Sequence, residues 1–164
     1  MAYTVCRLDN MAGTQNATKL RSAKFLVGST ATEIENGRVV KLNGLVNGER
    51  DLHKAVAPDK AATIGQIGLV ATPEIMYDER KRNLDDFINP AGDAIRVYVL
   101  TSNDQFSITV DGVTGSPAVG QVIELDGTTK LKAVATATAG STIVGKVIAI
   151  EKVGTKNFCV IEVA

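Results

Sequence analysis

The sequence predicts a mainly β fold, either a small β-barrel or a β-tulip-like sandwich. The 164-residue chain has 15 glycines, no tryptophan and only 4% aromatic residues. Its core must therefore come from Val, Ile, Leu and Ala, and the first two favour strands. Asn-Gly steps at 36–37, 43–44 and 47–48 favour the positive φ of tight turns. Short apolar or alternating runs between turn residues complete the pattern of a β protein.

The first 24 residues differ from the rest, because they are polar and only weakly periodic. Residues 3–6 are the one short strand-like run in this segment. The segment predicts an extended N-terminal arm ahead of a single β-rich domain over 25–164. A disordered tail is the alternative, but Tyr3, Val5 and Leu8 are apolar anchors that a purely solvated tail does not need.

Strands are expected through most of the domain. Runs at 25–27 and 38–42 precede two more at 94–100 and 106–110. The second of these alternates apolar and polar residues, which is typical of a strand with one wet face. About four further strands are expected in 118–164, of which the last covers 157–163.

The segment 73–92 interrupts this rhythm as a charged insertion. Thr72, Pro73 and Glu74 resemble a helix start, with a capping hydroxyl, a proline at the first position and an early acid. A dense charge cluster follows at 78–82, and Asn89-Pro90 closes the segment. We expect a short helical or irregular excursion from the sheet here.

The distribution of charge argues against a nucleic-acid partner. The chain has 18 basic and 18 acidic residues, so its net charge is zero, whereas phosphate binding requires a cationic face. The charges are nevertheless unevenly spread. Residues 1–32 have four cations and one acid, a net charge of +3, and residues 74–93 have six acids and three cations, a net charge of −3.

No chemical motif points to an enzyme, a metal or a cofactor. Cys6, Cys159 and the one histidine, His53, are too few for a four-ligand zinc site. The cysteines are expected to be free thiols, although a disulfide between paired chain ends is conceivable. Hydrolase elbows and phosphate-binding loops are absent. We expect no signal peptide and no membrane partner, because no apolar run approaches a spanning length.

The order of these segments resembles a family of phage proteins. The relevant stretches are IENGRVVKLNGLVNGER, then GLVATPEIMYDERKRNLDDFINPAGDAIRVYVL, then SPAVGQVIELDGTTKLKA and GSTIVGKVIAIE. Together they are similar to the capsid decoration (cement) proteins and related auxiliary head proteins of tailed phages. The motifs are turn and glycine patterns that cover most of the chain. This chain is longer than the best-known small members and adds the charged segment.

The resemblance implies a structural role and no catalytic residues. Such proteins are made in the host cytoplasm, bind the outer capsid surface of the virion and clamp neighbouring subunits of the major capsid protein. Many are trimers, and some are dimers or monomers, so self-association is expected here. An extended arm can add a strand to a neighbour's sheet edge, and repetition over a lattice strengthens weak contacts.

The predicted contact residues lie in the arm and in the charged insertion. One hypothesis uses the arm as the docking segment, and a second pairs its cations with the acidic insertion of a neighbouring copy. The candidate capsid or subunit contacts are Tyr3, Val5, Arg7, Leu8, Lys19, Arg21, Lys24, Asp78, Arg80, Arg82, Asp85 and Asp86.

Two other classes of protein stay open. The first is another virion part, such as a tail-tube, head–tail joining or head-fibre base protein, which would assemble without a shell. The second is a small β-barrel enzyme or ligand-binding domain, which requires a pocket lined by His53 and acids of 78–93.

Overall fold

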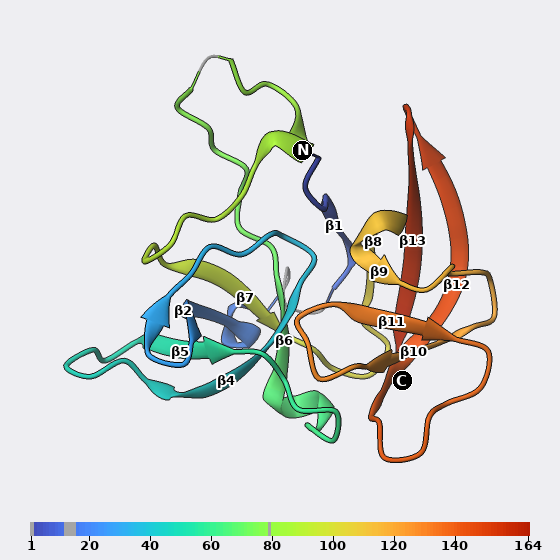
Figure 1. Ribbon diagram of the computed structural model, residues 1–164, viewed down its shortest axis with the longest axis horizontal. Coiled ribbons are helices and arrows are strands. Elements are labelled where there is room, and N and C mark those ends of the chain that lie inside the picture. Colours follow the sequence, from blue (N-terminus) through green and yellow to red (C-terminus); the bar gives the residue numbers. More distant parts are fainter. Residues whose placement is uncertain (1, 12–15, 79) are drawn as a thin grey trace.

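A computed structural model describes residues 2–11, 16–78 and 80–164 and shows a closed barrel beside a larger sheet (Figure 1). The barrel side contains β2 (Leu20–Val27), β3 (Thr30–Ala31), β4 (Val39–Leu45), β5 (Leu52–Val56), β6 (Ile67–Val70) and β7 (Ile95–Val99). The sheet contains β1 (Cys6–Asn10), β8 (Gln105–Thr109), β9 (Val113–Thr114), β10 (Val122–Leu125), β11 (Leu131–Val134), β12 (Ile143–Val153) and β13 (Lys156–Val163). Four 3₁₀ turns connect them: η1 (Ala17–Lys19), η2 (Ile64–Gln66), η3 (Leu84–Asp86) and η4 (Val110–Gly112). The predicted mainly β class and the small barrel are confirmed.

The barrel closes because β2 pairs on both of its edges. The strand order is β2-β5-β4-β6-β7, and β7 returns to pair with β2. The β2–β5 pair is parallel and the other barrel pairs are antiparallel. Closure leaves these five strands without a free edge, and the short β3 is added outside the circuit against the end of β2.

The seven-stranded sheet has the order β1-β8-β13-β12-β10-β11-β9. Its longest ladder joins β12 to β13 through a two-residue turn at Gly154 and Thr155. Gly154 has a φ of +61°, which such a tight hairpin requires. The register shifts between Val147 and Ala149, so a bulge re-aims the outer half of β12.

The same barrel strands contribute side chains to two separate hydrophobic cores, because successive side chains alternate between the two faces of a strand. On β4, Val39 faces the core between barrel and sheet, whereas Val40 faces the barrel interior. Leu69 and Val70 divide in the same way on β6. Successive side chains point to opposite faces of a strand, so barrel strands that are covered on both faces have continuous apolar runs.

Residues 2–11 and 16–24 do not form the extended arm that the sequence predicts, and the rest of that predicted arm lies outside the described residues. β1 pairs with β8 at the edge of the large sheet, and β2 begins at Leu20 inside the barrel. Val5 and Met11 are buried in the chain's own interior, with exposed fractions of 4% and 1%. The apolar positions that suggested contacts to a neighbour are therefore used within the same chain, where β1 extends the edge of its own sheet.

The structure confirms the positive φ predicted at the three Asn-Gly steps, although one of the steps is not a turn, and it confirms an irregular insertion without a helix at its start. Gly37, Gly44 and Gly48 all have positive φ, as expected. Gly44, however, lies within β4 where the pairing to β5 shifts register, so it marks a bulge and not a turn. The insertion is irregular apart from η3, and no helix begins at Pro73, because the Thr72 hydroxyl accepts a hydrogen bond from the Arg96 backbone.

The two cysteines are free thiols, as the sequence predicts. Both Cys6 and Cys159 lie opposite Ile108 of β8, one on each side. Two strand spacings separate them by roughly 10 Å, which is beyond the Cα separation that a disulfide spans.

Candidate functional site

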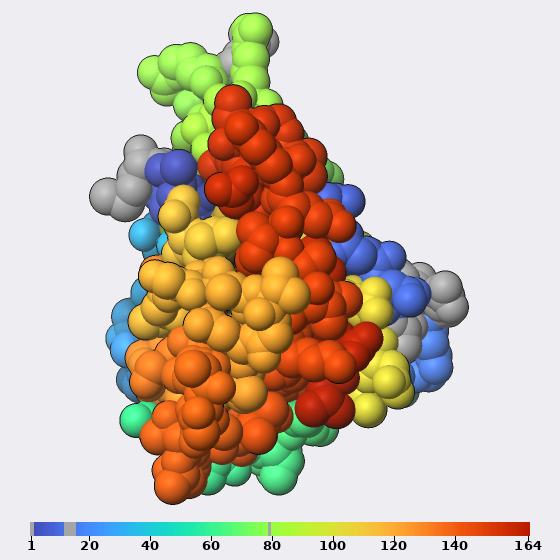
Figure 2. Space-filling view, turned by 90° about the vertical axis from the view of Figure 1, so that its right-hand side faces the viewer, coloured from blue at the N-terminus to red at the C-terminus, as the bar shows by residue number. Residues whose placement is uncertain are grey.

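Two segments protrude from the same end of the molecule. We call residues 72–94 the projection and residues 150–156 of β12 and β13 the hairpin tip. Figure 1 shows them at the top, on opposite sides of the N-terminal segment, and Figure 2 shows both at the same end after a quarter turn. Both segments therefore protrude from the body of the molecule, where they can reach another molecule.

Buried asparagines fix the base of the projection. The Asn36 side chain donates to the Thr72 carbonyl (2.8 Å) and accepts from the Thr72 backbone N–H (3.0 Å). On the other limb, the Asn89 side chain donates to Asn36 Oδ1 (3.1 Å) and to the Ile34 carbonyl (2.9 Å). Asn36 and Asn89 have exposed fractions of only 1% and 2%. Both limbs of the projection are therefore tied to one point in the barrel wall.

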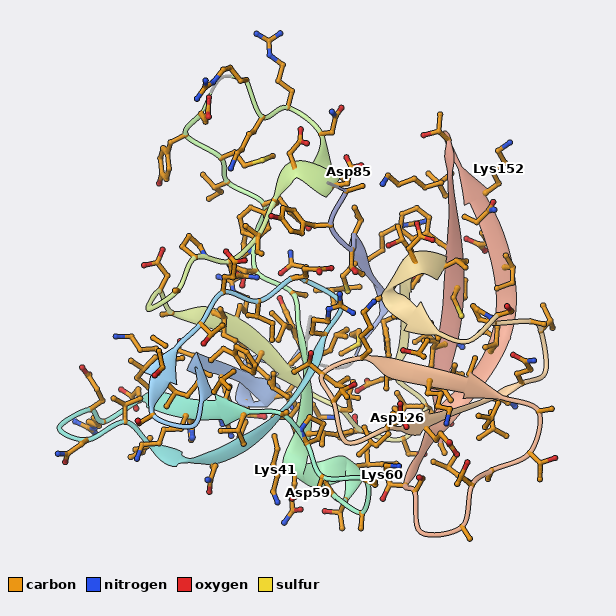
Figure 3. The ribbon with its side chains drawn as sticks, in the orientation of Figure 1. Lys41, Asp59, Lys60, Asp85, Asp126 and Lys152 are labelled. Atoms are coloured by element: carbon orange, nitrogen blue, oxygen red, sulfur yellow. The ribbon has the colours of Figure 1, made fainter. Side chains whose placement is uncertain are left out.

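An ion pair connects the projection to the hairpin. Lys156 Nζ lies 2.7 Å from Asp85 Oδ2, and both side chains are partly shielded from solvent. This hydrogen bond lowers the pKa of Asp85 and outweighs the opposing effect of burial. The backbone N–H of Tyr3 also donates to the Asp85 carbonyl (2.8 Å). In Figure 3, Asp85 lies where the projection, the N-terminal segment and the sheet meet.

Among the described residues, five of the nine exposed large apolar side chains lie on the projection or the hairpin tip, and the other four are Val27, Leu45, Val119 and Ile143. Tyr77 is 95% exposed, and Ile75 and Leu84 are also exposed on the projection. Ile150 and Val153 are exposed on the outer half of β12. Single exposed apolar residues are ordinary, but a grouping of large ones marks an interaction surface. Aromatic side chains in particular are enriched at protein–protein contacts.

A cleft of about 540 Å³ lies between the two limbs of the projection. Its apolar walls include Pro73, Ile75, Met76, Tyr77, Phe87 and Ile88. Its charged residues are Asp78, Lys81, Asp86, Asp93 and Arg96, so acids outnumber cations by one. The combination of an apolar lining and a few charged groups suits the docking of a side chain or a short peptide segment.

The predicted acidic residues mostly have structural partners within the projection. Arg80 donates to both carboxylate oxygens of Asp78 at 3.0 Å, and these hydrogen bonds lower the pKa of Asp78. Asp86 accepts hydrogen bonds from the backbone N–H groups of Arg82 and Asn83 at the start of η3. These contacts shape the loop, so its charges are only partly available to a neighbour.

The predicted basic residues are distributed over both sheets. Arg7 lies over the Phe158 ring at 5.7 Å and near Asp9 on the large sheet. Lys19 donates to the Thr101 hydroxyl, and Arg21 donates to the carbonyls of Thr18 and Leu20. Lys24 lies on β2 in the barrel wall. Leu8 packs against the shared core. The structure therefore does not gather the predicted contacts into one docking segment.

Two features escaped the sequence reasoning. One is the hairpin tip, whose signal is the apolar run 147–150 followed by charges and the Gly154 turn. The other is a buried ion pair in which Arg38 lies 2.8 Å from Glu35. The Glu35 carboxylate also accepts from the Thr4 backbone and hydroxyl. Glu35 and Arg38 are only three positions apart, but no local pattern signals the contacts of Glu35 to Thr4, because the tertiary fold brings that residue close.

The one histidine and the possible metal ligands are dispersed in the part of the chain that is described. No group of three or more His, Cys, Asp or Glu residues there is arranged to hold a metal ion. His53 lies on β5 and is not among the residues that line the projection's cleft. The pocket of His53 and insertion acids, on which the enzyme alternative depended, is therefore not formed by these residues.

A functional argument for this chain depends on its fold and its surface, because comparisons with known proteins give no match. No protein-family model, curated protein or solved structure matches this chain. Across the described ranges, no helix has the length and apolar character needed to span a bilayer.

Proposed function

We propose that this chain is a structural virion protein that binds the outer surface of a phage capsid and stabilises contacts between major capsid protein subunits. The resemblance in segment order to decoration proteins motivates the proposal. A mainly β body is compatible with it, as is a projection that is anchored at its base and has three exposed large apolar residues among its charged ones. The main supporting observation is the exposed group of Ile75, Tyr77 and Leu84 on a projection that buried asparagines anchor.

A cement protein needs surfaces that reach its neighbours without deforming its core. The projection meets this requirement, because its limbs are tied to Asn36 while its apolar residues face solvent. Pre-organisation reduces the entropy lost on binding. Many copies on one shell also let modest contacts act together. We place the capsid contact on the projection and not on the predicted arm, whose described residues include β1 and the start of β2.

The test is binding of the purified protein to expanded, undecorated capsid shells, measured by co-sedimentation. The wild type is expected to sediment with the shells. Tyr77→Ser should weaken binding about tenfold or more, because a truncated aromatic anchor typically costs over about 1.4 kcal/mol. Leu45→Ser is the matched control, since Leu45 is an exposed apolar residue on β4 in the barrel.

Two outcomes would contradict the proposal. Absence of shell binding together with tubes or rings of the protein alone would favour the tail-tube or connector alternative. Equal loss of binding in Tyr77→Ser and Leu45→Ser would show that the projection is not the contact surface.

A further inference from the structure

The three Asn-Gly steps of the chain lie in different surroundings. Asn36-Gly37 comes shortly before β4, Asn43-Gly44 lies within β4, and Asn47-Gly48 lies in the loop that joins β4 to β5. Figure 1 shows this loop at the far left of the molecule, where it extends away from the barrel. Asparagine is one of the thermolabile residues, and a following glycine makes it more reactive, so the surroundings of each step decide whether it reacts.

The reaction of an Asn-Gly step is loss of the side-chain amide. The backbone nitrogen of the glycine attacks Cγ of the asparagine, so an N–Cγ bond forms and the Cγ–Nδ2 bond breaks. Nδ2 leaves as ammonia together with the proton of the glycine N–H, and a cyclic imide remains. Water then opens the ring at either carbonyl, which gives aspartate or isoaspartate. Glycine favours the attack because it has no Cβ to crowd its nitrogen and its backbone rotates freely.

The fold restrains both reacting groups of Asn36-Gly37. The Gly37 N–H, which supplies the nucleophile, donates to the Val70 carbonyl (2.8 Å). The Asn36 amide donates to the Thr72 carbonyl (2.8 Å) and accepts from the Asn89 side chain (3.1 Å). Rotation of the Asn36 side chain toward the Gly37 nitrogen therefore breaks buried hydrogen bonds, and their loss costs free energy. This step is protected in the folded protein.

Asn47-Gly48 has none of these restraints. The Asn47 side chain is exposed and forms no hydrogen bond with the described residues. The Gly48 N–H likewise donates to no described group, and no atom lies within 4 Å of the position that a Cβ of Gly48 would take. One hydrogen bond, from the Glu49 N–H to the Val46 carbonyl (3.0 Å), closes the turn around the step. Opening of this single exposed bond lets the two reacting atoms approach each other.

Asn43-Gly44 is intermediate between the other two steps. Both residues are exposed, but they belong to β4. They lie where the pairing of β4 with β5 shifts register, between Leu42 and Leu45, which are both paired. The ladder on either side restrains the backbone of this step more than the turn restrains Asn47-Gly48.

We propose that Asn47 is a site of spontaneous deamidation in the folded protein, and that the three steps react in the order Asn47, Asn43, Asn36. Water is the co-reactant, and ammonia is released. Each event adds one carboxylate, so the net charge at pH 7 changes from zero to −1. The isoaspartate product also adds a carbon to the backbone, in a loop outside both hydrophobic cores. This modification is independent of the proposed function.

The test incubates the folded protein in isotopically labelled water at mildly alkaline pH and follows each step by peptide mass mapping. Alkaline pH favours the deprotonated nucleophile, and the oxygen label marks each amide that water replaces. We expect the amide of Asn47 to be lost about tenfold or more faster than that of Asn36, because a buried step reacts only during local opening. Ion-exchange chromatography should show a more acidic form that accumulates at the rate of the loss at Asn47.

Two controls separate the effect of the fold from that of the sequence. In urea-unfolded protein the three steps should react at similar rates, since only the fold distinguishes them. Asn47→Gln should abolish the fast loss and leave the rates at Asn43 and Asn36 unchanged, because a glutamine must form a larger ring. The substitution is in an exposed turn, so the variant is expected to keep the fold.

Three results would overturn the inference. One is an equal rate of loss at Asn36 and Asn47 in the folded protein, or a faster loss at Asn43 than at Asn47. Another is an Asn47 that reacts in urea but stays intact in the folded protein, because the turn would then protect it. The third is an acidic form that accumulates equally fast in Asn47→Gln.

Discussion

Glu35 and Arg38 form the best-shielded ion pair in the described part of the chain, and they connect three distant segments. Glu35 accepts two hydrogen bonds from Thr4, and Arg38 lies 3.4 Å from the Gly112 carbonyl. Burial by itself raises the pKa of Glu35, but the hydrogen bonds from Thr4 and the nearby Arg38 guanidinium lower it overall. The pair thus joins two distant segments to the chain before β4, because Glu35 binds Thr4 and Arg38 binds the Gly112 carbonyl of η4.

The first prediction concerns the pH dependence of this pair. Because the folded-state pKa of Glu35 is lowered, its contribution to stability is fully present above its unfolded value of about 4.5 and is lost as pH falls toward the folded value. Glu35→Gln should reduce the free energy of unfolding at pH 7 by about 2 kcal/mol, since Arg38 loses its counter-charge. Urea titrations at pH 7 and pH 3.5 measure both proteins.

The difference between wild type and Glu35→Gln should shrink at the lower pH. Other carboxylates titrate in both proteins, so the comparison isolates Glu35. A difference that stays constant with pH would show that the charge of Glu35 does not stabilise the fold.

At the scale of elements, the projection is a mostly irregular loop that buried asparagines hold at its base and that Lys156 and Tyr3 contact at Asp85. Asn36 hydrogen-bonds to Thr72 on one limb and to Asn89 on the other. The conformation of the loop therefore depends on a residue that is 36 positions before its first limb. The short helical or irregular excursion expected over 73–92 is confirmed in its described residues, and this distant clamp explains why the helix-like pattern at Pro73 does not begin a helix.

The second prediction follows from this clamp. Asn36→Ala should lower the free energy of unfolding by about 2 kcal/mol, because buried groups of both limbs lose their partner. Amide hydrogen exchange in residues 73–92 should accelerate more than in β2 or β13. Asn47→Ala is the matched control, because Asn47 also precedes a glycine of positive φ but is exposed. Equal effects of the two substitutions would argue against the clamp.

Strands and turns were largely predictable from the sequence, because their signals are local. Asn-Gly steps and alternating runs determine φ and the buried face without reference to distant residues. The pairing of β1 with β8 was not predictable, since it depends on residues about 100 positions apart. The candidate contact residues were inferred from charge along the chain, whereas the cleft and the hairpin tip exist only in three dimensions.

At the scale of the whole molecule, barrel and sheet share one core. Val39, Leu69 and Tyr98 point from the barrel into the same cluster as Phe106 and Ile161 of the sheet. These residues are buried, so separation of the two parts would expose large apolar side chains to water. Although the strands form two sheets, their stabilities are coupled.

The third prediction is therefore a single unfolding transition. Calorimetry should give one peak, with equal calorimetric and van't Hoff enthalpies. Leu69→Ala should lower the stability of the whole protein by about 2–5 kcal/mol, since a fully buried leucine is lost from the shared core. Two resolved peaks, or a variant that loses only the barrel transition, would show that the parts fold independently.

The placement of the two cysteines has a consequence for durability. Cys6 and Cys159 lie on opposite sides of β8, and burial raises the pKa of Cys159 to about 11. Thiols in this state are almost fully protonated at neutral pH, whereas oxidation and exchange proceed through the thiolate. Cys6 and Cys159 therefore cannot form a disulfide with each other, and they do not readily form one with another protein. We expect its fold to have the same stability under reducing and oxidising conditions, so that a reductant should leave its unfolding midpoint unchanged.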